Sequence, residues 1–141
     1  MTRIYWDSML FVYWIEDHPE YAGRVQQIYE TMQERGDTLS TSVFTLGEVL
    51  VGPYQRKAHD LVRSITEYFT GPDVDLLPMS KEAAVEFARI RSTQRVSPAD
   101  AIHLATAANS GVDLFLTNDH RLHRLIVPGI RFIAGLDVNV F

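Results

Sequence analysis

Four acidic residues stand beside apolar segments that lie far apart in the chain: Asp7, Glu48, Asp100 and Asp119. If the fold brings their carboxylates together without basic partners, they will repel one another and stay partly protonated. A divalent cation reverses this effect, because Mg²⁺ and Mn²⁺ prefer oxygen ligands. One or two such ions can activate water and stabilise the leaving oxygen in phosphodiester hydrolysis. The set therefore suggests a metal-dependent hydrolytic site, provided that the fold places the four residues in one crevice.

Each acid also has an interpretation as a simple helix cap. Ser97 fits a helix N-cap, and Asp100 stands three residues later, where an acid can reach back to the amide of the cap. Glu48 has the same spacing from Thr45. The other two acids stand where they could cap a following helix or close a turn. Taken one at a time, the acids are typical of capping residues, and only the ordered set indicates a site.

The elements that must position these acids alternate between strand and helix patterns along the chain. Strand-like runs occupy residues 3–6, 38–42, 74–79, 114–117 and 131–134. Helical patterns occupy residues 9–15, 20–35, 44–50, 57–69, 81–92, 98–110 and 120–125. This order predicts an α/β fold of three layers, in which a central parallel sheet of about five strands carries helices on both faces.

In such sheets, sites form at the carboxyl ends of the strands, which tests each acid by its position. Asp7 directly follows the first predicted strand, and Asp119 follows the fourth. Asp37 and Asp113 precede their strands and belong at the opposite edge. The remaining two acids of the set lie near helix starts that can face the same crevice. The four candidates therefore pass this test together.

The composition bounds the class of protein. A chain of 141 residues with 46% hydrophobic residues is the size of one domain, which we expect to span residues 1–141. The absence of cysteine excludes disulfides, zinc–thiolate sites and thiol catalysis. The longest apolar run, residues 9–15, is too short for a membrane span, so we expect a soluble, cytoplasmic protein. A net charge of −5 argues against nucleic-acid binding by bulk attraction but not against a nuclease whose acids bind metal.

The segments around the four acids resemble the PIN-domain family, in particular the VapC-type toxins of toxin–antitoxin pairs. The similarity spans nearly the whole chain in the family's order and is carried by the segments "IYWDSMLFVYW", "TSVFTLGEVLVG", "SPADAIHLATAA" and "LFLTNDHRL". One departure is Ser8-Met9, where many members have a polar pair such as Thr-Asn. This departure leaves the Ser8 hydroxyl in place but removes a polar side chain at the next position.

The resemblance implies an Mg²⁺- or Mn²⁺-dependent endoribonuclease. Its catalytic and metal-binding residues would be Asp7, Glu48, Asp100 and Asp119, and their hydrogen-bonding support would be Ser8, Thr117 and Asn118. It also implies a homodimer and a small antitoxin protein that inserts a segment near the site. The substrate would be RNA.

Two arginine pairs are candidates for contacts with RNA phosphates. Arg91 and Arg95 have the i, i+4 spacing of one helix face, while Arg121 and Arg124 follow Asp119. A solvated helix face explains these residues equally well. His103 lies within an apolar helix, so we interpret it as a packed or hydrogen-bonded residue rather than a metal ligand.

Two other functions remain open. An aspartate-based phosphotransfer protein would use Asp7 as nucleophile, but the sequence has no second acid beside it, and Lys57 and Lys81 are poorly placed to assist. A non-catalytic RNA-binding or scaffold protein could keep the fold without the chemistry. The aromatic residues at 11–14 could stack on bases, but an apolar helix favours the core or a dimer interface instead.

Overall fold

Five parallel strands form one sheet in the computed structural model, which describes residues 2–137. In the order in which they pair, the strands are β3 (Asp75–Leu77), β2 (Thr38–Ser42), β1 (Arg3–Trp6), β4 (Val112–Leu116) and β5 (Ile130–Ala134). Every neighbouring pair is parallel. The predicted parallel α/β sheet is confirmed.

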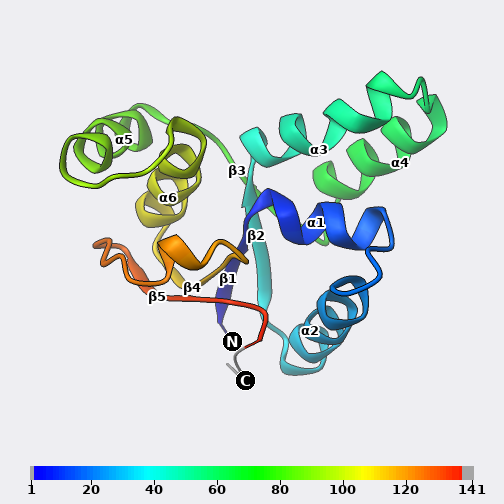
Figure 1. Ribbon diagram of the computed structural model, residues 1–141, viewed down its shortest axis with the longest axis horizontal. Coiled ribbons are helices and arrows are strands. Elements are labelled where there is room, and N and C mark those ends of the chain that lie inside the picture. The colour runs from blue at the N-terminus through cyan, green and yellow to red at the C-terminus, as the bar shows by residue number, and fades with distance from the viewer. Residues whose placement is uncertain (1, 138–141) are drawn as a thin grey trace.

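Helices cover both faces of the sheet (Figure 1). They are α1 (Ser8–Ile15), α2 (Ala22–Arg35), α3 (Val43–Gln55), α4 (His59–Thr70), α5 (Lys81–Thr93) and α6 (Pro98–Ser110), with a short 3₁₀ turn at His120–Leu122. In Figure 1, α5 and α6 lie on one side of the sheet and α1 to α4 on the other, where α3 and α4 project as an arm. Within residues 2–137, no helix combines the length and the apolarity that a membrane crossing requires.

The central strand β1 is buried on both faces, which explains its continuous apolar sequence. Ile4 and Trp6 point into the core formed with α1 and α2. Tyr5 points the other way, toward α6, and its ring stacks on Phe115 of β4 with centroids 4.9 Å apart. None of the three β1 residues Ile4, Tyr5 and Trp6 is exposed to solvent. The residue that follows this strand is therefore held by a rigid part of the fold.

The strand order creates a crevice at the carboxyl ends of β1 and β4. From β1 the chain proceeds to β2 and β3 on one side, and it returns to β4 on the other side. Parallel sheets open at such a switch point, and ligands bind there. The amide of Asp7 donates a hydrogen bond to the carbonyl of Leu116 at 3.1 Å, which joins the two strand ends. Residues that follow β1 and β4 are thereby brought side by side.

Several boundaries differ from the predicted ones. Helix α3 continues past residue 50 through the buried Pro53 to Gln55, and the amide of its C-cap Arg56 bonds the carbonyl of Gly52 at 3.0 Å. Helix α4 begins at His59 rather than at Lys57, which has a left-handed φ of 56°. The third strand spans only Asp75–Leu77, since Pro78 follows and has no amide hydrogen for a further ladder bond.

The prediction that Arg91 and Arg95 share a helix face is wrong. Helix α5 ends at Thr93, and Gln94 is extended, so Arg95 lies in the connection to α6. The Arg91 guanidinium donates to the carbonyl of Val96 at 2.6 Å, which helps to close this end of the helix. The 3₁₀ turn is likewise shorter than the predicted helix over 120–125, since it covers only His120–Leu122.

Candidate active site

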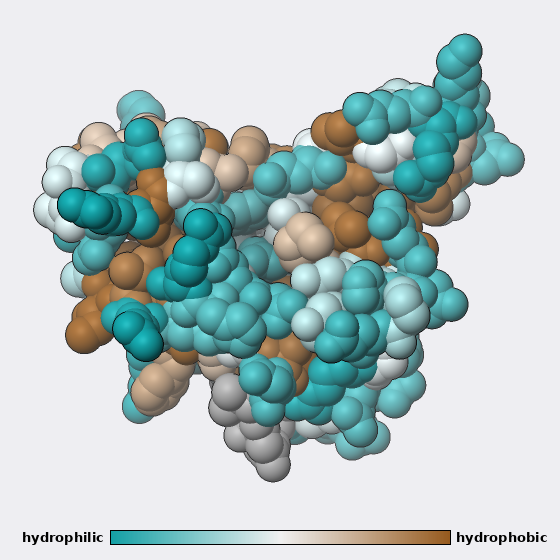
Figure 2. Space-filling model, viewed as in Figure 1, coloured by the Kyte–Doolittle hydropathy of each residue, from teal (hydrophilic) through white to brown (hydrophobic). Residues whose placement is uncertain are grey.

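All four predicted acids line one cleft at the crevice between β1 and β4. The cleft has a volume of about 220 Å³, and its lining consists of Asp7, Ser8, Met9, Tyr13, Glu48, Ala99, Asp100, His103, Asn118 and Asp119. Neither of the two lysines belongs to this lining, which argues against phosphotransfer to Asp7. In the space-filling view, the molecule is notched between the α5–α6 side and the projecting α3–α4 arm (Figure 2). The strand ends thus gather carboxylates that are up to 112 positions apart, from 7 to 119.

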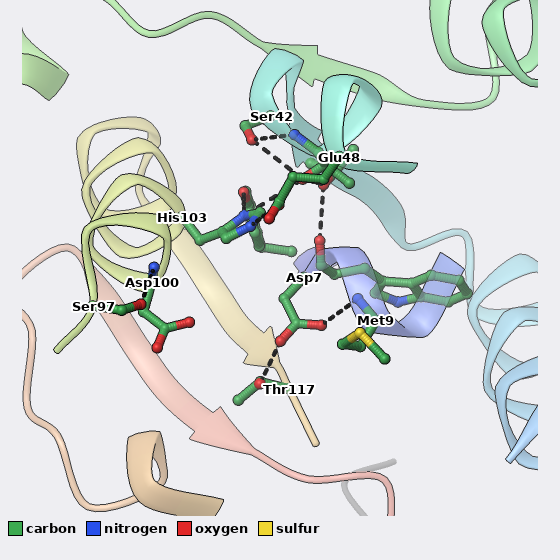
Figure 3. A network of polar contacts seen from close by, with 12 residues as sticks. Asp7, Met9, Ser42, Glu48, Ser97, Asp100, His103 and Thr117 are labelled. Atoms are coloured by element: carbon green, nitrogen blue, oxygen red, sulfur yellow. Dashed lines mark hydrogen bonds and ion pairs between the residues drawn. The ribbon is translucent and has the colours of Figure 1, made fainter. Parts of the chain in front are cut away.

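Asp7 is buried at the base of the site and is held by neutral donors (Figure 3). It is the N-cap of α1, where one carboxylate oxygen, Oδ1, accepts a hydrogen bond from the amide of Met9 at 3.0 Å. The other oxygen accepts a hydrogen bond from the Thr117 hydroxyl at the end of β4. Burial raises the pKa of the Asp7 carboxyl, although the hydrogen bond from Thr117 opposes this shift. The capping role and a role in the cleft therefore coexist in one residue.

Glu48 reaches the cleft from the second turn of α3. Its Oε1 lies 2.6 Å from Nε2 of His103, whose Nδ1 lies 2.7 Å from the Tyr5 hydroxyl. The alternative capping role for Glu48 is wrong, because Ser42 is the N-cap of α3 and accepts the amide hydrogen of Thr45. Glu48 is thus free of the helix start and contacts a histidine on α6. The expectation that His103 is a hydrogen-bonded residue is confirmed.

Asp100 lies in the first turn of α6, where only its backbone takes part in the cap. The Ser97 hydroxyl oxygen accepts the amide hydrogen of Asp100 at 3.1 Å. Among residues 2–137, no side chain or amide donates a hydrogen bond to the Asp100 carboxylate. In Figure 3, this carboxylate points toward the side of the cleft that carries Asp7 and Thr117. The helix start therefore delivers an unengaged carboxylate to the cleft.

Asp119 forms the opposite wall and is engaged by an arginine. The Arg121 guanidinium donates to both carboxylate oxygens, through Nε at 3.0 Å and Nη2 at 2.7 Å. These hydrogen bonds lower the pKa of the Asp119 carboxyl. Asp119 also caps the 3₁₀ turn, and the neighbouring Asn118 donates to the hydroxyl of Tyr13 at 3.1 Å. This acid reaches the cleft as one half of an ion pair.

The supporting residues and the arginines lie in different environments. Ser8 and Asn118 line the cleft, and the hydroxyl of Thr117 contacts Asp7. The candidate RNA-binding residues Arg91, Arg95, Arg121 and Arg124 are all exposed and lie outside the cleft lining. Only Arg121 among them contacts a cleft acid. Arg121 is therefore the one candidate of the four that the structure connects to a cleft acid.

The donor set of the cleft suits a hard divalent cation, with two carboxylates available for it. Asp7 and Asp100 offer oxygens with no cationic side chain bound to them, and Mg²⁺ usually takes only one or two protein carboxylates. Glu48 and Asp119 are engaged by His103 and Arg121. In the described part of the chain, no three Asp, Glu or His side chains are placed so that they could hold a metal ion as they stand. The cleft therefore combines two carboxylates that have no cationic partner with two that a basic side chain already engages.

A larger cavity, of about 500 Å³, lies at the amino edge of the sheet and has a different character. Its lining includes Asp37 and Asp75, each of which pairs with an arginine. The charges of these two acids are matched by Arg35 and Arg3, so that Asp73, which is exposed to solvent, is the remaining acid of the lining. The smaller cleft at the carboxyl edge is the better candidate for chemistry.

Sequence reasoning missed Tyr13, which lines the cleft, and Tyr5, which contacts the lining residue His103. Tyr13 belongs to an aromatic stretch that was expected in the core, and its ring does pack on Tyr21, but its hydroxyl accepts the hydrogen bond from Asn118. Tyr5 stands in the middle of a buried strand, and nothing in the sequence links it to His103. The only signal for His103 is its spacing of three residues from Asp100, which puts both on one side of α6.

Comparisons with known proteins give one family match and several similar folds. A family model described as PIN domain matches residues 4–127. The fold is similar to that of the VapBC2 pair from Rickettsia felis, solved with a DNA fragment from its promoter, with a TM-score of 0.74, 16% identity, and coverage of 94% of this chain and 98% of that chain. A comparison with curated proteins gave no significant match.

Two further solved structures have the same fold. VapC20 from Mycobacterium tuberculosis, a toxin that cleaves the sarcin–ricin loop, has a TM-score of 0.70 at 13% identity, with coverage of 87% and 96% of the two chains. A toxin–antitoxin complex from Klebsiella pneumoniae has a TM-score of 0.68 at 18% identity, with coverage of 90% and 94%. At these identities, the similarity concerns the fold.

Proposed function

The chain belongs to the PIN domain family, and we propose that it is a metal-dependent endoribonuclease that hydrolyses RNA phosphodiester bonds as the toxin of a type II toxin–antitoxin pair. The structural neighbours support this proposal, since one is a toxin that cleaves the sarcin–ricin loop and others are toxin–antitoxin complexes. We infer that the protein acts in the cytoplasm, where a toxin of this kind would meet its RNA substrate.

One observation carries the proposal: two carboxylates without a cationic partner, Asp7 and Asp100, line the same cleft as Glu48 and Asp119. Such a concentration of negative charge is unfavourable for a phosphate ligand unless a divalent cation is present. Asp7 and Asp100 would hold Mg²⁺ or Mn²⁺, and Glu48 and Asp119 would complete the site. When bound, the ion would supply positive charge to the phosphate and lower the pKa of a water molecule.

The remaining residues orient these acids and bind the RNA. Thr117 and the amide of Met9 fix both oxygens of Asp7, so that its position does not depend on the ion. Ser8 and Asn118 supply further hydrogen-bonding groups at the cleft. The exposed arginines are available to RNA phosphates, and they are Arg91, Arg95, Arg121 and Arg124. Arg121 and Arg124 are favoured because they directly follow the cleft residue Asp119.

Two protein partners complete the proposal. An apolar groove between α1 and α4 is lined by side chains that include Phe11, Trp14 and Tyr68 and suits a segment of a small antitoxin. Figure 2 shows apolar residues gathered where the α3–α4 arm overhangs the body of the protein. A second copy of the chain would cover exposed apolar residues of α3 such as Val51 and Tyr54. These surfaces support an antitoxin partner and a homodimer.

The first test compares wild type, Asp100→Asn and the matched control Asp73→Asn, an exposed acid at the amino edge. At an Mn²⁺ concentration of 100 times the dissociation constant, the ion should stabilise wild type and the control by about 2.7 kcal/mol. Asp100→Asn should lose most of this gain and most of the RNA cleavage. Without metal, it should be as stable as wild type, because the Asp100 carboxylate makes no capping bond.

A non-catalytic RNA-binding or scaffold role is the alternative that this test addresses. The engagement of Glu48 by His103 and of Asp119 by Arg121 favours it, since both acids already have partners. Under this alternative, wild type would bind RNA but neither cleave it nor gain stability from Mn²⁺. That result, with EDTA as the reference condition, would contradict the proposed function.

A further inference from the structure

A buried chain of hydrogen bonds leads from the central strand to Glu48. The Tyr5 hydroxyl on β1 lies 2.7 Å from Nδ1 of His103 on α6, and Nε2 of the same ring lies 2.6 Å from Oε1 of Glu48 on α3. Tyr5 has no exposed surface, and His103 is 4% exposed. Three separate elements thus meet through two short polar contacts, and two of the three residues, Glu48 and His103, line the cleft.

The chemistry of the three groups fixes the direction of these hydrogen bonds. An ionised carboxylate can only accept, so Nε2 of His103 carries a hydrogen and donates it to Glu48. When the ring is neutral, Nδ1 has a lone pair that accepts a hydrogen bond from the Tyr5 hydroxyl. The Thr45 hydroxyl lies 3.4 Å from the same nitrogen. Burial raises the pKa of Tyr5 to about 12, so the phenol remains a donor at neutral pH. With a neutral ring, Tyr5 and Glu48 favour the same tautomer of His103 from opposite sides of the ring.

This arrangement restrains one oxygen of Glu48 and leaves the other available. The ring of His103 is itself held between Tyr5 and Phe44, with centroid distances of 5.9 Å and 5.4 Å. Within residues 2–137, Oε2 of Glu48 has no hydrogen-bond donor. A free glutamate side chain would lose considerable conformational freedom on binding a cation, whereas a carboxylate that is already oriented loses less.

We propose that Tyr5 and His103 are positioning residues that hold Glu48 with one oxygen available to the cation of the cleft. This inference rests on the proposed function, because it concerns the same site. In this inference, His103 orients Glu48 and is not itself a metal ligand. It also gives Tyr5, which is remote from the cleft surface, an effect on metal affinity.

The test measures the Mn²⁺ dissociation constant by calorimetry, without RNA, for Tyr5→Phe, Glu48→Gln and the double variant. Phenylalanine keeps the stacking on Phe115 and removes only the hydroxyl. We expect Tyr5→Phe to raise the dissociation constant by about tenfold, as is typical when an outer partner of a metal ligand is lost. In the Glu48→Gln background, the same change should have no further effect, because Tyr5 acts through Glu48.

Two further variants separate positioning from packing. His103→Gln keeps an amide donor near the place of Nε2 and should bind Mn²⁺ more tightly than His103→Leu, which has no donor. Tyr29→Phe is the matched control, since Tyr29 lies on α2 outside the cleft lining and its hydroxyl accepts a hydrogen bond from Gln33, and it should leave the dissociation constant unchanged. Thermal unfolding of every variant reports whether the fold is intact.

The outcomes distinguish this inference from the proposed function. If wild type and Tyr5→Phe bind Mn²⁺ with the same affinity, the positioning role is overturned and the proposed function stays intact. An equal effect of Tyr5→Phe in the wild-type and Glu48→Gln backgrounds also overturns it, because the hydroxyl would then act independently of Glu48. Wild type that binds no Mn²⁺ overturns both.

Discussion

Two aspartates at opposite edges of the same sheet have nearly identical surroundings except for charge. Asp37, before β2, accepts a hydrogen bond from the amide of Thr2 at 3.0 Å and another from Nε of Arg35 at 2.9 Å. Asp7, after β1, accepts one from the amide of Met9 and one from the hydroxyl of Thr117. Each carboxylate thus has one backbone donor and one side-chain donor, but only Asp37 has a cation.

This difference separates an acid that stabilises the structure from one that is available for a ligand. The side chain of Asp37 is 1% exposed, yet its charge is compensated by Arg35 within the protein. Asp7 is also buried, and neutral donors leave its charge uncompensated, which is unfavourable in the absence of a cation. The protein therefore carries at its carboxyl edge a negative charge that a bound Mg²⁺ or Mn²⁺ would balance.

The same substitution at both edges gives the largest expected difference. Asp7→Asn should lower RNA cleavage by more than about 100-fold, beyond what loss of an outer partner of a metal ligand usually costs, and should remove the stabilisation by Mn²⁺. Asp37→Asn should keep both but lower the free energy of unfolding by about 1–3 kcal/mol, because a charge-assisted hydrogen bond is lost at a buried site. Cleavage assays and thermal unfolding with and without Mn²⁺ measure both effects. Similar behaviour of the two variants would contradict the comparison.

A second prediction concerns the pH dependence of the metal-free protein. Because the pKa of Asp7 in the folded protein is raised above its ordinary value of 3.8, the folded state binds this proton more tightly than the unfolded state. Relative to Asp7→Asn, wild type should therefore gain stability as the pH falls through the raised pKa, and the gain should be complete below 3.8. Urea unfolding in EDTA at a series of pH values measures this difference between the two proteins.

Saturating Mn²⁺ should reverse the sign of this trend. Protons then compete with the ion for Asp7, so that wild type loses stability relative to Asp7→Asn as the pH falls. A difference between the two proteins that is independent of pH in EDTA would show that burial does not perturb Asp7. In that case, the contrast with Asp37 would lose its electrostatic basis.

The sequence predicted those features that depend on local pattern. Strand-like runs in the sequence located all five strands, and the position of Asp7 and Asp119 after strand ends predicted the edge at which they lie. The helix start at Ser97 was also predictable, because its hydroxyl acts on an amide only three residues away. Each of these features is set by residues close together in the sequence, so tertiary packing leaves it unchanged.

Features that depend on register and on distant partners were not predictable. Two hydroxyl residues, Ser42 and Thr45, could each begin α3, and the end of β2 selects Ser42 as the cap. The contact between Tyr5 and His103 joins residues 98 positions apart through the packing of α6 on the sheet. The spacing of Arg91 and Arg95 wrongly predicted one helix face, because the helix ends at Thr93 and the extended Gln94 places Arg95 in a loop.

The smallest expected effect concerns the ion pair of Asp119 with Arg121, which shares the cleft with the unpaired Asp7. The Arg121 side chain is 84% exposed, and exposed ion pairs contribute little to stability, so a phosphate of RNA can take over this guanidinium. Arg121→Ala should therefore bind Mn²⁺ a few-fold more tightly, because Asp119 is released, while its affinity for RNA falls.

Arg124→Ala is the matched control: it removes the same charge nearby, so it should weaken RNA binding without a comparable gain in Mn²⁺ affinity. Calorimetry measures the Mn²⁺ affinity of the two variants, and binding titrations at two salt concentrations measure their affinity for RNA. If both variants gained equally in Mn²⁺ affinity, the gain would come from the general field of the arginines, and Asp119 would belong with the structurally paired acids such as Asp37.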